Sequence, residues 1–186
     1  MSCTRLIERL MTVEEAACWV TDEELRLVAT FGSERRRREY LSWRAVVRRQ
    51  LGREVEIAYN EVGAPYLVGR SEHLSVAHGA DRVAVVIADH AVGIDIERLD
   101  RRFEQIRSRY LTPAEEQLSD DPHFLAVAWC AKEALYKLAG EHALSLRDDL
   151  HLLAYDGETL TAQIKNGERI ALSVLKGETY VVVSTL

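Results

Sequence analysis

Cysteines and long apolar runs are both scarce in this chain of 186 residues, and each scarcity excludes a class of protein. The three cysteines, Cys3, Cys18 and Cys130, are odd in number, widely spaced and form no Cys-x-x-Cys pair. They argue against a disulfide framework or a zinc site and favour a reducing cytoplasm. No apolar run approaches the length of a membrane span, and the charged N-terminal segment predicts no secretory signal.

Charge is unevenly distributed along the chain. The net charge of −6 gives no general attraction to nucleic acid, and the 47% apolar fraction with 29% charged residues is typical of a folded globular protein. Within this acidic chain, one segment concentrates eight arginines: Arg35, Arg36, Arg37, Arg38, Arg44, Arg48, Arg49 and Arg53. This patch indicates a local anion site or a surface for an acidic partner, although a solvated helix face would give the same pattern.

A short acidic motif lies in the middle of the chain, at Val92-Gly-Ile-Asp-Ile-Glu97. The motif predicts a strand, on which Asp95 and Glu97 project to one side and the two isoleucines to the other. Like charges held side by side destabilise a strand unless a cation bridges them. The motif therefore indicates a cation site, and the alternative is the polar end of an ordinary strand.

A second motif, Trp129-Cys-Ala-Lys-Glu-Ala-Leu-Tyr-Lys137, predicts a helix. Trp129, Glu133 and Lys137 follow at intervals of four and form one stripe, although such a glutamate–lysine pair also simply stabilises helices. If this helix packs over the end of the strand, three carboxylates converge beside two lysines. Hard oxygen ligands next to cations suit Mg²⁺ and a phosphate-bearing substrate.

The order of predicted elements indicates an α+β fold built from two similar halves. Each half has helices packed on a small, mainly antiparallel sheet, with the site at their junction. We place the N-terminal half at 1–98 and the C-terminal half at 99–186. Helices are expected from Thr21, over 33–51, and from Asp121 through Lys137. Strands are expected at 55–59, 66–68, 74–78, 83–88, 92–96, 150–155, 159–164, 170–175 and 179–184.

These motifs together resemble the 4′-phosphopantetheinyl transferases, in particular the short bacterial kind resembling surfactin synthetase activating enzyme. Gly-x-Asp-x-Glu followed by Trp-x-x-Lys-Glu-Ala-x-x-Lys is similar to the two signature motifs of that family. Further similarities extend the resemblance from about residue 35 to residue 140, at Arg36–Leu41 with Arg44, Gly63–Leu67 and Leu74–His78.

The resemblance implies a holo-[acyl-carrier-protein] synthase. Such an enzyme moves the phosphopantetheine arm of coenzyme A to a serine of an acyl or peptidyl carrier protein and releases adenosine 3′,5′-bisphosphate. It also implies Mg²⁺, or Mn²⁺ in its place, with coenzyme A as co-substrate. A carrier protein would be the partner, with no nucleic acid or membrane involved, and a chain of two halves could work as a monomer.

The resemblance also implies roles for the acidic and basic residues of the two motifs. Asp95, Glu97 and Glu133 would hold the metal against the diphosphate. Glu133 would in addition act as, or position, the general base for the serine hydroxyl, directly or through water. Lys137 would stabilise the charge on the departing bisphosphate, and Lys132 would bind the same phosphates more loosely.

The remaining cations complete the implied coenzyme A site. His78 follows a strand and would donate to a phosphate oxygen. Arg44, with Arg36 and Arg37, would bind the 3′-phosphate, because the guanidinium fork fits phosphate geometry.

Two positions depart from the family pattern. Ala77 stands where serine is frequent, and Ala64 where lysine is frequent, so one hydroxyl and one cation are missing near coenzyme A. Two alternatives remain: another Mg²⁺-dependent phosphohydrolase, and a non-catalytic module that binds carrier proteins. Three clustered carboxylates argue against the module, and the arginine-rich helix argues against a simple phosphohydrolase.

Overall fold

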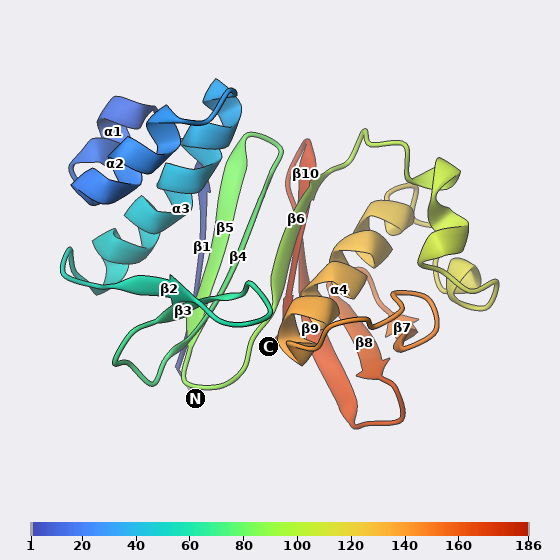
Figure 1. The fold of residues 1–186 in the computed structure, drawn as a ribbon. Helices are drawn as coiled ribbons and strands as arrows, with labels where there is room; N and C mark the ends of the chain where they lie inside the picture. The colour runs from blue at the N-terminus through green and yellow to red at the C-terminus, as the bar shows by residue number, and fades with distance from the viewer. Residues whose placement is uncertain (1, 186) are drawn as a thin grey trace.

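The computed structural model describes residues 2–185 and shows an α+β protein, as the sequence predicts (Figure 1). In the N-terminal part, three helices lie on one face of an antiparallel sheet. The sheet has the order β1 (Cys3–Arg9), β5 (Arg82–Ala88) and β4 (His73–Gly79). The helices are α1 (Val13–Ala17), α2 (Asp22–Ala29) and α3 (Glu34–Leu51).

Polar caps determine where these helices begin. Thr12 and Thr21 each accept a hydrogen bond from the backbone of a glutamate three residues later, and that glutamate bonds back to the threonine N–H. Ser33 caps α3, which ends at Leu51 as predicted. Strand β1 and helix α1 were not predicted.

A small hairpin follows α3. Strands β2 (Ile57–Tyr59) and β3 (Pro65–Leu67) pair antiparallel, and β3 lies against β4. Strand β2 is shorter than the predicted 55–59, and β3 begins one residue before the predicted 66–68. The turn between them is closed by the Asn60 side chain, which accepts hydrogen bonds from the backbone of Val62 and Ala64. Gly63 in this turn has φ of 77°, a conformation that favours glycine.

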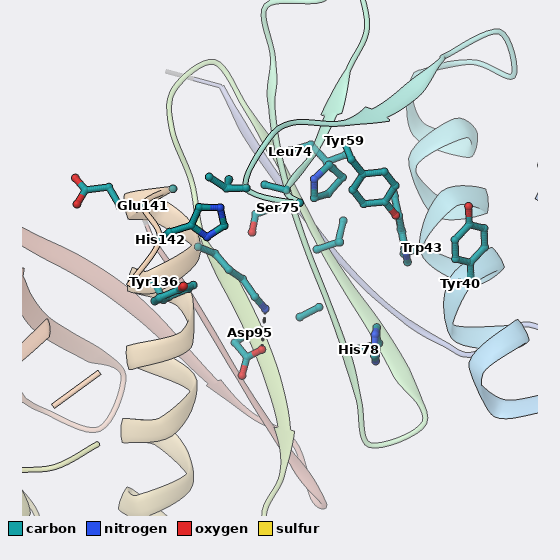
Figure 2. A pocket seen from close by; sticks show the side chains of 18 of the residues that line it. Tyr40, Trp43, Tyr59, Leu74, Ser75, His78, Asp95, Tyr136, Glu141 and His142 are labelled. Carbon is teal, nitrogen blue, oxygen red and sulfur yellow. Dashed lines mark hydrogen bonds and ion pairs between the residues drawn. The ribbon is translucent and has the colours of Figure 1, made fainter. Parts of the chain in front are cut away.

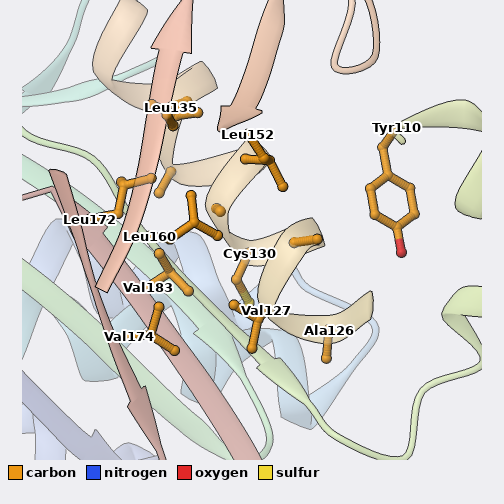
Figure 3. Close-up of a cluster of buried hydrophobic side chains, with 14 of the residues drawn as sticks. Tyr110, Ala126, Val127, Cys130, Leu135, Leu152, Leu160, Leu172, Val174 and Val183 are labelled. Atoms are coloured by element: carbon orange, nitrogen blue, oxygen red, sulfur yellow. The ribbon is translucent and has the colours of Figure 1, made fainter. Parts of the chain in front are cut away.

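The C-terminal part consists of a five-stranded antiparallel sheet covered by α4 (Phe124–Ala139) (Figure 1). Its strands follow the order β6 (Ile94–Arg98), β10 (Tyr180–Thr185), β9 (Arg169–Lys176), β8 (Thr159–Ile164) and β7 (Leu150–Tyr155). Figure 3 shows the core between helix and sheet, where Val127, Cys130 and Leu135 of α4 lie among strand residues.

The position of β6 corrects one detail of the sequence interpretation, which placed this strand in the N-terminal half. Strand β6 is hydrogen-bonded to β10, so Asp95 and Glu97 belong to the five-stranded sheet. Its isoleucines, Ile94 and Ile96, nevertheless pack with Ala84 and Val86 of β5 in a third core cluster. The strand therefore joins the two parts, and the division at residue 98 and the similarity of the halves stay predictions.

The connection between β6 and α4 is irregular. It contains three 3₁₀ turns, at Phe103–Gln105, Arg107–Arg109 and Glu115–Gln117. Helix α4 begins at Phe124, three residues after the expected Asp121, and ends at Gly140 with φ of 61°. Within residues 2–185, no helix combines the length and apolar character required to cross a membrane.

Candidate functional site

A cavity of about 460 Å³ lies where the two parts of the molecule meet. Helix α3, the hairpin and β4 contribute to it from the N-terminal part, and β6 and the end of α4 from the C-terminal part (Figure 2). Its size falls in the range of small-molecule and cofactor sites. The junction of the two parts is where the sequence predicted the site.

The close approach of α4 to β6 depends on a glycine immediately before the strand. A Cβ on Gly93 would lie 1.9 Å from the carbonyl oxygen of Ala134, in the middle of α4. No larger residue fits unless the helix moves. This contact brings the last turn of α4, which carries Lys137, next to the start of β6, which carries Asp95.

Charged side chains from four elements line the cavity: Arg36 of α3, His78 of β4, Asp95 of β6 and Lys137 of α4. Lys137 Nζ donates to Asp95 Oδ1 and to the carbonyl oxygen of Ile94, both at 2.9 Å, and a dashed line marks the first contact in Figure 2. The structure thus brings together four residues that lie far apart in the sequence, and all four were singled out from it.

Glu97 and Glu133, the other two residues predicted as metal ligands, lie near Asp95. Burial raises the pKa of Glu133, and the negative charges of Asp95 and Glu97 raise it further, while Lys137 and Arg101 oppose this. Burial also raises the pKa of Glu97, with Arg101 acting against it and Asp95 adding to it. Arg101 forms an ion pair with Glu97. The three carboxylates therefore form one electrostatically coupled group.

One oxygen of this acidic group suits a divalent cation. Among residues 2–185, Asp95 Oδ2 is buried without a hydrogen-bond partner, and an orphaned carboxylate oxygen is a ready ligand for a hard cation. Among residues 2–185, however, no three His, Cys, Asp or Glu side chains stand close enough together to hold a metal ion. Lys137 and Arg101 instead neutralise Asp95 and Glu97. The metal-ligand roles of the three acids stay predictions.

Aromatic rings line the cavity on both sides. Tyr40 and Trp43 of α3 and Tyr59 of β2 lie on one side, and Tyr136 and His142 lie on the side of α4, near Asp95 (Figure 2). The sequence analysis assigned none of these five residues to the site. Tyr40 and Trp43 fitted the apolar period of the helix, and no local signal distinguished them from core residues.

Tyr40, Trp43 and Tyr59 form an aromatic wall of the cavity. Arg44 lies behind this aromatic wall, with 2% of its surface exposed. Its guanidinium donates to the Tyr59 hydroxyl at 2.6 Å and to the Tyr40 carbonyl at 2.9 Å, and its Nε lies 3.2 Å from Glu24 Oε1. The guanidinium carbon also lies 3.4 Å from the centre of the Tyr40 ring. Arg44 therefore keeps Tyr40 and Tyr59 in position and does not itself line the cavity. Its predicted contact with a 3′-phosphate stays a prediction.

Two other predicted phosphate contacts lie away from the cavity. Lys132 is fully buried on the far side of α4, where it donates to Glu115 Oε1 at 2.6 Å and to the carbonyl oxygen of Leu150. Arg37 donates through Nε and an Nη to the carbonyl oxygen of Phe31 at 2.9 and 2.7 Å. The geometry gives both side chains structural partners and does not favour phosphate contacts, because buried or doubly bonded cations are not free for a ligand.

Taken together, an α+β fold whose junction cavity combines cations, carboxylates and aromatic rings defines a protein suited to a phosphorylated, ring-containing ligand. Comparison with known families narrows this class. Residues 91–182 match the family model described as 4′-phosphopantetheinyl transferase superfamily. The matched segment contains Asp95, Glu97, Glu133 and Lys137. No curated protein matches the chain significantly.

Proposed function

We propose that this protein transfers the 4′-phosphopantetheine arm of coenzyme A to a serine of an acyl or peptidyl carrier protein. The observation that carries the proposal is the juxtaposition of Asp95 and Lys137, both within the matched superfamily segment, in a cavity that also receives Arg36 and His78. Mg²⁺ dependence, the use of coenzyme A, the carrier partner and the cytoplasmic location all form part of this proposal.

The transfer exchanges one phosphorus–oxygen bond for another. The serine oxygen bonds to the phosphorus that carries pantetheine, and the bond from that phosphorus to the bridging oxygen breaks. Adenosine 3′,5′-bisphosphate leaves with the bridging oxygen. Glu133 accepts the serine proton directly or through water.

Lys137, in the last turn of α4, supports the same phosphoryl transfer. Its ammonium already lies against β6 and projects into the cavity, where it stabilises the negative charge that develops on the departing bisphosphate. Asp95, Glu97 and Glu133 would hold Mg²⁺. When bound, the ion neutralises the oxygens of the diphosphate.

The side chains that line the cavity suit the parts of coenzyme A. Tyr40, Trp43 and Tyr59 offer ring faces for the adenine base. Arg36 and His78, which line the same cavity, offer donors for the phosphates. Ala64 at the hairpin turn also lines it without adding a cation.

The proposal is tested by incubating the protein with apo carrier proteins, coenzyme A and Mg²⁺. Intact-mass measurement should show one added phosphopantetheine arm per carrier, with release of an equal amount of adenosine 3′,5′-bisphosphate. A carrier with its acceptor serine changed to alanine is the control and should stay unmodified. Unmodified carriers across several types would contradict the proposal. Hydrolysis of simple phosphate esters without use of coenzyme A would favour the phosphohydrolase alternative.

A further inference from the structure

A buried carboxylate stands behind His78, outside the residues assigned to the transfer reaction. Glu39, on α3, is 9% exposed. Its Oε2 lies 3.5 Å from Nδ1 of His78, and its Oε1 accepts a hydrogen bond from Nε of Arg35 at 2.9 Å. The carboxylate is therefore held from both sides, by a guanidinium on its own helix and by an imidazole on β4.

His78 in turn lines the cavity (Figure 2), whereas the Glu39 carboxylate that it contacts does not. The charged groups that act on its ring are Glu39, Arg36, Lys137 and Asp95, of which Glu39 is the nearest charge partner. Burial lowers the pKa of His78, and the Glu39 carboxylate works in the opposite direction. Arg36 and Lys137 add to the lowering, so Glu39 is the main influence that favours a protonated ring.

We propose that Glu39 is a positioning residue that fixes the ring orientation and the proton of His78 for phosphate binding. The nitrogen that carries the proton of a histidine is set by the hydrogen bond that its partner supplies. A carboxylate at Nδ1 keeps a proton on that nitrogen and leaves Nε2 for the cavity. Once the ring takes up a second proton, Nε2 donates to a phosphate oxygen while Nδ1 still donates to Glu39.

This inference rests on the proposed function only for the identity of the phosphate, which belongs to coenzyme A. The state of the His78 ring is a property of the protein without any ligand. The two claims can therefore fail separately, and the test has one arm for each.

The first arm is nitrogen NMR of the histidine side chains in the full-length protein, with the His78 signals assigned by their loss in His78→Asn. The wild type should show His78 protonated at Nδ1. Glu39→Gln should move the ring toward the tautomer protonated at Nε2. Glu34→Gln changes an exposed glutamate at the start of the same helix and should leave the spectrum unchanged. An unchanged His78 tautomer in Glu39→Gln would overturn the proposal.

The second arm is calorimetric binding of coenzyme A. Glu39→Gln should weaken binding about 10-fold, the usual size of losing one charge-assisted hydrogen bond. In a His78→Ala background the same change should have an effect below about 2-fold, because Glu39 acts through that ring. An equal loss in both backgrounds would show that Glu39 acts independently of His78. Glu39→Asp, which keeps the charge, serves as the second variant if Glu39→Gln unfolds.

Discussion

At the scale of single residues, the site is organised by a few buried charges whose partners come from other elements. Asp95 is the clearest case, because one oxygen accepts from Lys137 and the other has no partner in the described part of the chain. The motif around Asp95 singled out this residue from the sequence, and its role as a metal ligand stays a prediction. The partners of Arg44 could not be predicted, because Glu24 and Tyr59 reach it only after α2 and the hairpin fold against α3.

The unpartnered oxygen of Asp95 leads to the first prediction. Asp95→Ala should abolish Mn²⁺ binding, followed by electron paramagnetic resonance, and reduce transfer at least about 100-fold, as loss of a group that stabilises developing charge usually does. Asp100→Ala is the matched control, because Asp100 is an exposed carboxylate just beyond the same strand. Wild-type Mn²⁺ binding in Asp95→Ala would remove this residue from the metal site.

The aromatic wall gives a second prediction. Tyr59→Phe removes the hydroxyl that Arg44 donates to and leaves a buried guanidinium N–H without that acceptor. Urea unfolding should show a stability loss of about 1–3 kcal/mol, and the affinity for coenzyme A should fall. Tyr66→Phe on the same hairpin is the control, because Tyr66 is exposed like Tyr59, whereas Arg44 donates to the hydroxyl of Tyr59. Equal effects of the two changes would contradict the role given to Arg44.

Glu24 gives a third prediction, on pH. Burial alone would raise its pKa, but hydrogen bonds from Arg48 and the Thr21 backbone, with the charge of Arg44, lower it below 4.5. The folded state thus binds fewer protons, so this stabilisation is present above about pH 4.5 and is lost as pH falls through the lowered pKa.

Urea unfolding of Glu24→Gln measures this contribution. At pH 7 the variant should be less stable by about 3 kcal/mol, because it leaves two buried arginines without their carboxylate. The difference from the wild type should shrink steadily below about pH 4.5. A difference that does not change between pH 7 and pH 3 would show that the carboxylate charge of Glu24 is not what stabilises the fold.

At the scale of elements, regular strands with clear turns were predicted best. The bounds expected for β7 and β8 agree with the structure, because Asp156-Gly157 separates them sharply. Strand β1 was missed because its charged side chains break the alternation of apolar residues, and its pairing with β5 depends on the fold. Helix α4 begins late because Asp121, Pro122 and His123 form a turn.

The contact between β6 and α4 gives a fourth prediction. Gly93→Ala places a Cβ against the Ala134 carbonyl and must push the helix away from the strand. Thermal or urea unfolding should show a loss of about 1–3 kcal/mol, and transfer should fall further, because Lys137 moves away from Asp95. Gly32→Ala is the control, since a Cβ there meets no atom within 4 Å. Full activity in Gly93→Ala would mean that this close approach is dispensable.

At the scale of the whole molecule, the site exists because one strand, β6, connects the N-terminal and C-terminal parts. Strand β6 takes its hydrogen bonds from β10 and its apolar neighbours partly from β4 and β5. The sequence predicted a site at the junction. It did not predict which sheet β6 would pair with, because strand pairing is decided by partners distant in the chain. Folding of both parts is therefore a condition for bringing α3 and α4 to one cavity.

The central claim is that the acids of β6 and α4 share one divalent cation against the diphosphate of coenzyme A. A crystal structure with coenzyme A and Mn²⁺, with the metal located by anomalous scattering, tests it most directly. The account predicts a metal peak contacted by Asp95, Glu97 and Glu133, with the diphosphate beside Lys137 and the adenine among Tyr40, Trp43 and Tyr59. A metal bound elsewhere, or coenzyme A outside this cavity, would contradict it.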